Sequence, residues 1–324
     1  LPEQWVRQQE STKLANSILI GITILLGGGL VAGAVWLFVR QVRRGAIRWG
    51  PALKVAIVMA VLIGLAELNR LPGVDRAYNT SISFANFRLQ VVVSLAVSLI
   101  LGGVLLWLAV GLATSLYPEV WQVFRAGQRR IWRRDAAIAL VVSLAVSAGI
   151  EKLVALFADH AQAYASLSFP LPPRGFDALS PGFGAFAHGL IYAIGESAVL
   201  GVAIYGICLA WRRRVWWFWP GAALVIVALG PAGAHSLAGW AAGWLMRAVP
   251  LLVAIALIAF FFRNNPLAYV LAAFCSTIAT PLVELLSNPA PFFRWNGVLL
   301  GILAAATVLW LLAPGARPER PVGI

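Results

Sequence analysis

Charged residues are scarce in this sequence. Only 11% of its 324 residues are Asp, Glu, Lys or Arg, whereas 61% are hydrophobic. Soluble domains have about 25% charged residues. Long uncharged runs recur along the whole chain. Because a helix satisfies its own backbone hydrogen bonds in lipid, the sequence predicts an all-α, polytopic membrane helical bundle.

Cysteine is also rare, and most catalytic motifs are missing. Cys208 and Cys275 both fall inside apolar runs, where a cysteine behaves as a small hydrophobic residue. No CxxC pair or Cys/His cluster indicates a structural metal, so we expect neither a metal nor a cofactor. The Walker loop, HExxH, GxSxG and the Rossmann fingerprint are absent as well, which excludes the commonest nucleotide-binding and hydrolase sites.

The charge that is present is strongly basic, with a formal net charge of +13. A basic balance can indicate a nucleic-acid partner, but no soluble basic domain with interleaved aromatic residues is present to bind one. The basic residues instead form short clusters between apolar runs, as cytoplasmic loops do. We therefore expect a multi-pass protein of the cell inner membrane, with the lipid bilayer as its surroundings and no nucleic-acid partner.

The apolar runs predict about nine transmembrane helices. With the N-terminus outside, nine alternating spans put the C-terminus in the cytoplasm, and every dense basic cluster then falls on the cytoplasmic side. One span too many or too few would invert the later clusters. The predicted spans are residues 16–39, 51–68, 89–116, 135–157, 181–211, 215–237, 249–262, 266–286 and 292–312, and the basic clusters are 40–54, 125–134, 212–214, 263 and 317–320.

Four regions are expected along the chain. Residues 1–14 are an extracytoplasmic lead-in, interpreted as the end of a soluble domain that precedes this sequence. Residues 15–134 form an N-terminal region of three membrane helices. Residues 135–313 form the membrane core, and residues 314–324 a cytoplasmic tail.

The predicted span 181–211 carries ionisable residues, which are costly inside a membrane and therefore indicate function. His188, Tyr192 and Glu196 follow one another at four-residue steps, so they share one helix face. At a rise of 1.5 Å per residue, Glu196 lies roughly 22 Å and His235 roughly 30 Å from the cytoplasmic ends of their helices, and His188 reaches the outer interface. Other acids expected in the outer half of the membrane are Glu67, Glu151 and Glu284.

A glutamate and a histidine at similar depth can act together on a water molecule. Glu196 would serve as the general base, and His235 would stabilise the developing oxyanion. The alternative from the residues alone is that these groups only join helices through hydrogen bonds.

Several segments carry a family resemblance. LPEQW precedes the first span, LNRLP at 68–72 ends the second, and SLYPEVW follows the third; IGESAVLGV at 194–202 and AHSLAG at 234–239 come later. With these features the chain resembles the CPBP intramembrane endopeptidases, the group of the type II CAAX prenyl endopeptidases, and in particular their long bacterial members. The resemblance makes residues 135–313 a CPBP-like core.

The family's catalytic pattern is EExxxR on one helix, FxxxH on a later helix, and a further histidine. Carried over to this sequence, Glu196 matches one glutamate and His235 matches the first histidine. The resemblance thus assigns Glu196 and His235 as the catalytic pair.

Other positions depart from that pattern. The second glutamate is replaced by Gly195 or Ser197, and the residue four before His235 is Pro231 rather than Phe. The arginine is replaced by Leu200 or Gly201, and no histidine occurs at 274–276, where the second one belongs.

Two functions follow as expectations. The first is a CPBP-type, endopeptidase-like membrane protein with weakened or lost proteolysis that still binds a membrane peptide or a lipid-modified protein; if active, it is a hydrolase. The second is a membrane transporter or proton path that uses Glu67, Glu151, Glu196 and Glu284.

Overall fold

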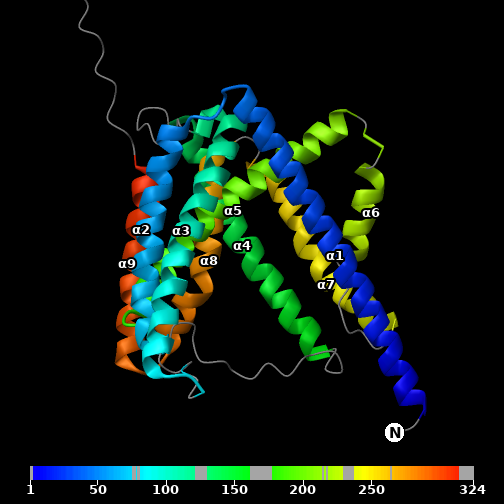
Figure 1. The fold of residues 1–324 in the computed structure, drawn as a ribbon, viewed down its shortest axis with the longest axis horizontal. Coiled ribbons are helices and arrows are strands. Elements are labelled where there is room, and N and C mark those ends of the chain that lie inside the picture. The colour runs from blue at the N-terminus through cyan, green and yellow to red at the C-terminus, as the bar shows by residue number, and fades with distance from the viewer. Residues whose placement is uncertain are drawn as a thin grey trace, which may run out of the picture. The chain divides into compact units, whose positions relative to one another are not determined.

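The computed structural model is helical along nearly all of the residues that it describes, which are 3–74, 78, 81–120, 130–160, 177–213, 215–216, 218–228, 237–262 and 265–313 (Figure 1). No strand occurs among them. The helices are α1 (Glu3–Arg43), α2 (Trp49–Val74), α3 (Phe84–Leu116), α4 (Arg130–His160), α5 (Pro181–Arg212), α6 (Phe218–Ala228), α7 (Leu237–Leu257) with a π-helical turn Ile258–Phe262, α8 (Pro266–Ser287) and α9 (Pro291–Leu312).

Seven of these helices are long and apolar enough to cross a bilayer, so the chain is a multi-pass helical membrane protein. They are α1, α2, α3, α5, α7, α8 and α9; within the described residues, α4 and α6 do not meet the criterion. The predicted all-α class is therefore confirmed. The count of nine spans and the orientation of the termini stay predictions.

Several helix boundaries differ from the sequence-based ones, as three cases show. α1 already begins at Glu3, so most of the expected lead-in 1–14 belongs to the first helix. α2 continues to Val74 and includes Pro72, whereas the predicted second span ends at residue 68. α7 begins at Leu237, which was expected to end the preceding span. In the last case hydropathy does not mark where one helix ends, because residues 218–262 contain a single charged residue, Arg247.

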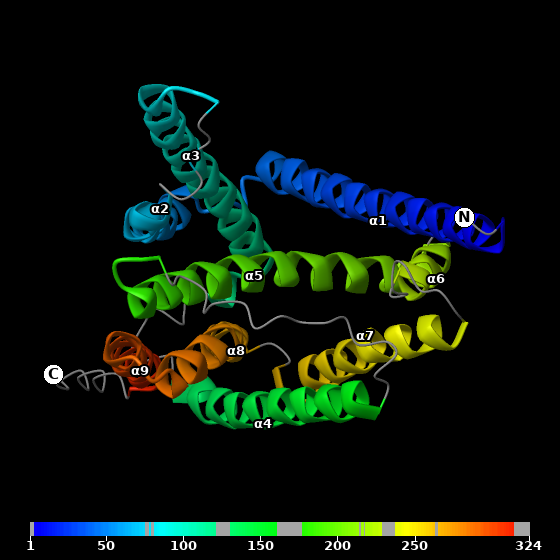
Figure 2. The same cartoon turned by 90° about the horizontal axis from the view of Figure 1, so that it is seen from below.

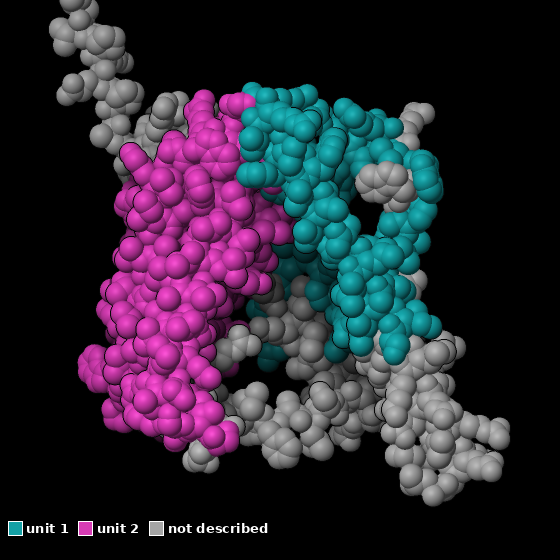
Figure 3. All heavy atoms as spheres, in the orientation of Figure 1, with its two compact units in different colours: residues 1–44, 146–168, 202–261 teal, residues 45–145, 169–201, 262–324 magenta. Residues whose placement is uncertain are grey.

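The chain divides into two compact units (Figure 3). Unit 1 comprises residues 1–44, 146–168 and 202–261, and unit 2 comprises residues 45–145, 169–201 and 262–324. In unit 1, α1 packs against α6, Trp244 of α7 donates from Nε1 to the carbonyl of Ile226 in α6 at 2.8 Å, and the rings of Trp211 and Trp219 meet edge to face.

Unit 2 contains two antiparallel helix pairs, α2 with α3 and α8 with α9. The first part of α5 lies between them (Figure 2). Its glycines allow the close approach: a Cβ on Gly184 would lie 2.9 Å from Asn69 Nδ2 of α2, and one on Gly182 would collide with the carbonyl oxygen of Asn296 in α9. α5 is therefore the central helix of unit 2.

The packing sorts the helix ends of unit 2 into two groups. At one end, Gly111 late in α3 approaches Ile47 and Trp49 at the start of α2. Likewise, Asn265 before α8 donates from Nδ2 to the carbonyl of Trp132 near the start of α4 at 2.9 Å. The opposite end holds the last turns of α2 and the first turns of α5 and α9, which are joined by hydrogen bonds.

Candidate functional site on α5

One face of α5 is fixed by close packing against α8. Ala187 and Ala193 are fully buried. A Cβ on Gly189 would lie 2.6 Å from Cγ2 of Ile278 and 3.4 Å from the ring of Phe274. The ring of Phe186 meets that of Phe274 edge to face at 6.0 Å. Small residues on this side hold α5 at a short distance from α8, and so they set the direction of its other faces.

The exposed face of α5 carries the three ionisable or polar residues singled out in the sequence. Tyr192 is 48% exposed, and His188 and Glu196 are exposed too. The rings of His188 and Tyr192 stack at 5.7 Å with an interplanar angle of 27°. The prediction that these residues share a face is thus confirmed for His188 and Tyr192, which are in contact. We refer to His188, Tyr192 and Glu196 as the α5 polar face.

Glu196 stands midway along α5, inside a helix that is apolar enough to span the membrane. A carboxylate at such a position costs about 2.5–3.5 kcal/mol on insertion scales when it faces lipid. Within the described residues, no hydrogen bond or ion pair satisfies its side chain. An exposed carboxylate at this depth requires water or a polar partner beside it, because hydrocarbon offers it no donor.

The α8 segment aligned with the family's second histidine packs against this part of α5. Ala193, Phe274 and Cys275 belong to one buried cluster with Leu140 of α4. Ala193 lies one turn before Glu196. The place where the resemblance expects the second histidine is therefore near the Glu196 level of α5, but it holds an apolar ring and a buried thiol.

The two positions aligned with the second glutamate face inward. A Cβ on Gly195 would lie 3.3 Å from Cδ2 of Leu106 in α3. The Oγ atom of Ser197 is buried and has no hydrogen-bond partner among the described residues. A carboxylate at either position would be directed into packed surroundings rather than along the exposed face that carries Glu196.

Of the other predicted acids, the two whose side chains are described, Glu67 and Glu284, do not join Glu196. Glu67 forms an ion pair with Arg70 of its own helix at 3.5 Å, and both side chains are substantially exposed. Glu284 is exposed in the last turn of α8. The side chain of Glu151 and the whole of His235 lie outside the described residues, the latter two positions before α7 begins. The predicted pairing of Glu196 with His235 therefore stays a prediction.

A second polar cluster was not predicted as a site. It joins three segments and consists of Asn69 in α2, Ser180 before α5 and Asn296 in α9, and we call it the Asn–Ser–Asn network. Asn69 exchanges two hydrogen bonds with the backbone of Ser180, at 2.9 and 2.8 Å. Asn296 Oδ1 accepts from Ser180 Oγ at 2.7 Å and from the Gly182 amide at 3.2 Å. The network pins the start of α5.

The sequence offered only a weak signal for this network. Asn69 stood out as a polar residue at the end of an apolar run, but Ser180 and Asn296 have no spacing relation to it. Ser180 lies 111 positions after Asn69, and Asn296 lies 116 positions after Ser180. Amides that meet across three helices have no period, so a pattern search does not find them.

No group of three potential metal ligands occurs among the described residues. Comparisons with protein-family models, with curated proteins and with solved structures return no match. The chemistry of the α5 polar face is therefore limited, on its own residues, to one carboxylate, one imidazole and one phenol on a single helix.

Proposed function

We propose that this chain is an inner-membrane protein similar to the CPBP intramembrane endopeptidases, with proteolysis weakened or lost, and that its α5 polar face binds a membrane-embedded peptide or lipid-modified chain. The observation that carries the proposal is Glu196, exposed midway along an apolar spanning helix beside Tyr192. A membrane retains such a carboxylate where a polar ligand or water meets it.

The loss of proteolysis rests on the surroundings of Glu196. The positions aligned with the partner glutamate are directed into packed neighbours, and the segment aligned with the second histidine contributes Phe274 and Cys275 to a buried cluster. Removal of one preorganised group from a hydrolytic site typically lowers the rate about 10²-fold or more. Glu196, with or without His235, would retain ligand binding better than turnover.

The transport alternative has less support among the described acids. A proton path needs ionisable groups that follow one another at hydrogen-bond or water-bridged distances. Glu67 is engaged with Arg70, and Glu284 lies in the last turn of its helix. Glu196 alone among the described glutamates stands in the middle of a span.

The test uses the full chain in liposomes with a fluorescent farnesylated peptide. We expect peptide binding by the wild type, binding about tenfold weaker in Glu196→Gln because a hydrogen bond to a charged group is lost, and unchanged binding in Glu284→Gln, a matched substitution at an exposed glutamate of α8. Cleavage of the peptide, followed by mass spectrometry, should be slow or absent in all three.

Two results would contradict the proposal. Equal peptide binding by the wild type and Glu196→Gln would remove the α5 polar face as the site. Collapse of an imposed pH gradient by the wild type, but not by Glu196→Gln, would favour the proton path instead.

A further inference from the structure

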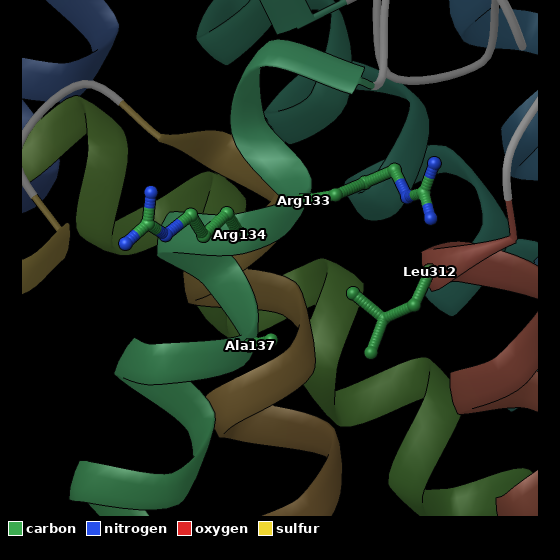
Figure 4. A pocket seen from close by; sticks show the side chains of 4 residues that line it. All are labelled: Arg133, Arg134, Ala137 and Leu312. Carbon is green, nitrogen blue, oxygen red and sulfur yellow. The ribbon is translucent and has the colours of Figure 1, made fainter.

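A pocket of about 390 Å³ lies at the end of unit 2 where α4 begins and α9 ends (Figure 4). Arg133, Arg134 and Ala137 of α4 and Leu312 of α9 line it. Its size falls in the range of small-molecule sites, which is about 300–1,000 Å³. The guanidinium group of Arg133 beside an apolar side chain makes a site for a ligand that is anionic at one end and apolar at the other.

Arg133 is the residue that most needs such a ligand. Its side chain extends over the space beside Leu312, whereas Arg134 leaves the same turn of α4 in the opposite direction (Figure 4). The Nε atom of Arg133 is buried and has no hydrogen-bond partner among the described residues. Arginine stays protonated at all relevant pH values, and a buried donor without a partner costs about 1–3 kcal/mol. An acceptor placed in the pocket would remove that cost.

Helix electrostatics do not account for the arginines. Arg130, Arg133 and Arg134 all stand within the first turns of α4, and no acidic residue occurs in its first turn. Basic side chains are unfavourable at a helix N-terminus, because the macrodipole is positive there. Within the described part of the chain, neither Arg133 nor Arg134 forms an ion pair with a carboxylate. The first six residues of α4 hold three arginines and one acid, Asp135, and therefore carry a net positive charge.

The backbone beneath the pocket is held in place before any ligand arrives. Asn265 is buried and caps α8, with Oδ1 accepting from the amide of Ala268 at 3.2 Å. Its Nδ2 atom donates to the carbonyl of Trp132, the residue next to Arg133, at 2.9 Å. The start of α4 is thereby tied to the start of α8. A fixed backbone reduces the entropy that a ligand must offset on binding.

We propose that this pocket binds a phosphate group, and that the phosphate is the headgroup of an anionic phospholipid. The planar guanidinium of Arg133 matches two phosphate oxygens. The surface of α9 one turn before Leu312 is apolar, with Leu309 68% exposed, and can accompany an acyl chain. Basic pockets between membrane helices commonly hold such headgroups. This site is separate from the α5 polar face and does not depend on the function proposed for it.

The test is native mass spectrometry of the full chain in an uncharged detergent, titrated with phosphatidylglycerol, phosphatidylcholine or sodium phosphate. We expect selective retention of phosphatidylglycerol, with affinity reduced about tenfold in Arg133→Gln, in line with a lost charged hydrogen bond. Arg48→Gln is the matched control, because Arg48 is exposed and outside the pocket, and its affinity should stay within about twofold of wild type.

A second variant keeps the proposal testable if Arg133→Gln fails to fold. Ala137→Phe fills the pocket and leaves both arginines in place, so it should also release the lipid. If excess sodium phosphate fails to displace phosphatidylglycerol, the result supports a lipid ligand. If sodium phosphate binds to the wild type but not to Arg133→Gln, the result supports a soluble anion at the same site instead of a lipid. Equal lipid binding by the wild type and both variants, or no preference over phosphatidylcholine, would overturn the proposal.

Discussion

Replacement of Asn296 by alanine should destabilise unit 2, because this side chain joins α9 to the start of α5. The Asn296 side chain accepts from Ser180 Oγ and from the Gly182 amide, and it donates to the carbonyl of Phe292. A hydrogen bond between membrane helices contributes about 0.6 kcal/mol on average, so the two bonds to Ser180 and Gly182 set a lower total near 1 kcal/mol. Because the Gly182 amide is buried, its loss of a partner adds about 1–3 kcal/mol. We expect a decrease of about 2–4 kcal/mol in the free energy of unfolding.

Unfolding can be followed through a thiol that the protein already contains. Cys275 is buried in the core of unit 2, whereas Cys208 is exposed. In a Cys208→Ser background, a thiol-reactive dye reports the exposure of Cys275 during titration with sodium dodecyl sulfate.

The matched control for Asn296→Ala is Thr307→Val in the same helix. Among the described residues, the Thr307 hydroxyl bonds only to the Leu303 carbonyl one turn away, so we expect a change below about 1 kcal/mol. A cost for Asn296→Ala no larger than that of the control would refute the stabilising role of the Asn–Ser–Asn network.

Two further predictions concern packing around the same helix. Gly189→Ala should destabilise unit 2 by about 1–3 kcal/mol, the usual range for overpacking, because the added Cβ would lie 2.6 Å from Ile278. The control is Gly206→Ala on the same helix. Its added Cβ meets nothing within 4 Å, so the substitution should be neutral or slightly stabilising in the dye assay. Maleimide treatment of the folded protein should label Cys208 alone, and mass spectrometry should show Cys275 labelled only after denaturation. Rapid labelling of both thiols in the native state would contradict the burial of Cys275 in the cluster that includes Ala193.

The fold class could be predicted because the apolar runs are long and their composition extreme. The bounds of the helices α5, α8 and α9 lie within about one residue of the predicted ones. Their starts could be predicted because prolines mark them, at Pro181, Pro266 and Pro291. The boundary between the predicted sixth and seventh spans was wrong, because Leu237 begins a helix in a stretch where hydropathy hardly changes. Local residue chemistry marks a helix start, whereas hydropathy marks only the presence of a helix.

The functional residues also differ in whether local sequence is enough to find them. Glu196 could be found from the sequence, because a carboxylate within an apolar run is conspicuous without knowledge of its neighbours. Asn296 and Arg133 could not, since an amide in a predicted span and an arginine in a basic cluster are individually ordinary. Their significance comes from contacts with segments far along the chain: Asn296 meets Ser180 and Gly182, and Arg133 lies in a pocket with Leu312. In both cases the structure shows what the sequence does not, namely whether a polar group has a hydrogen-bond partner once its helix is packed. That criterion also separates the polar groups that stabilise unit 2 from Glu196 and Arg133, which have no partner among the described residues and for which we propose ligands.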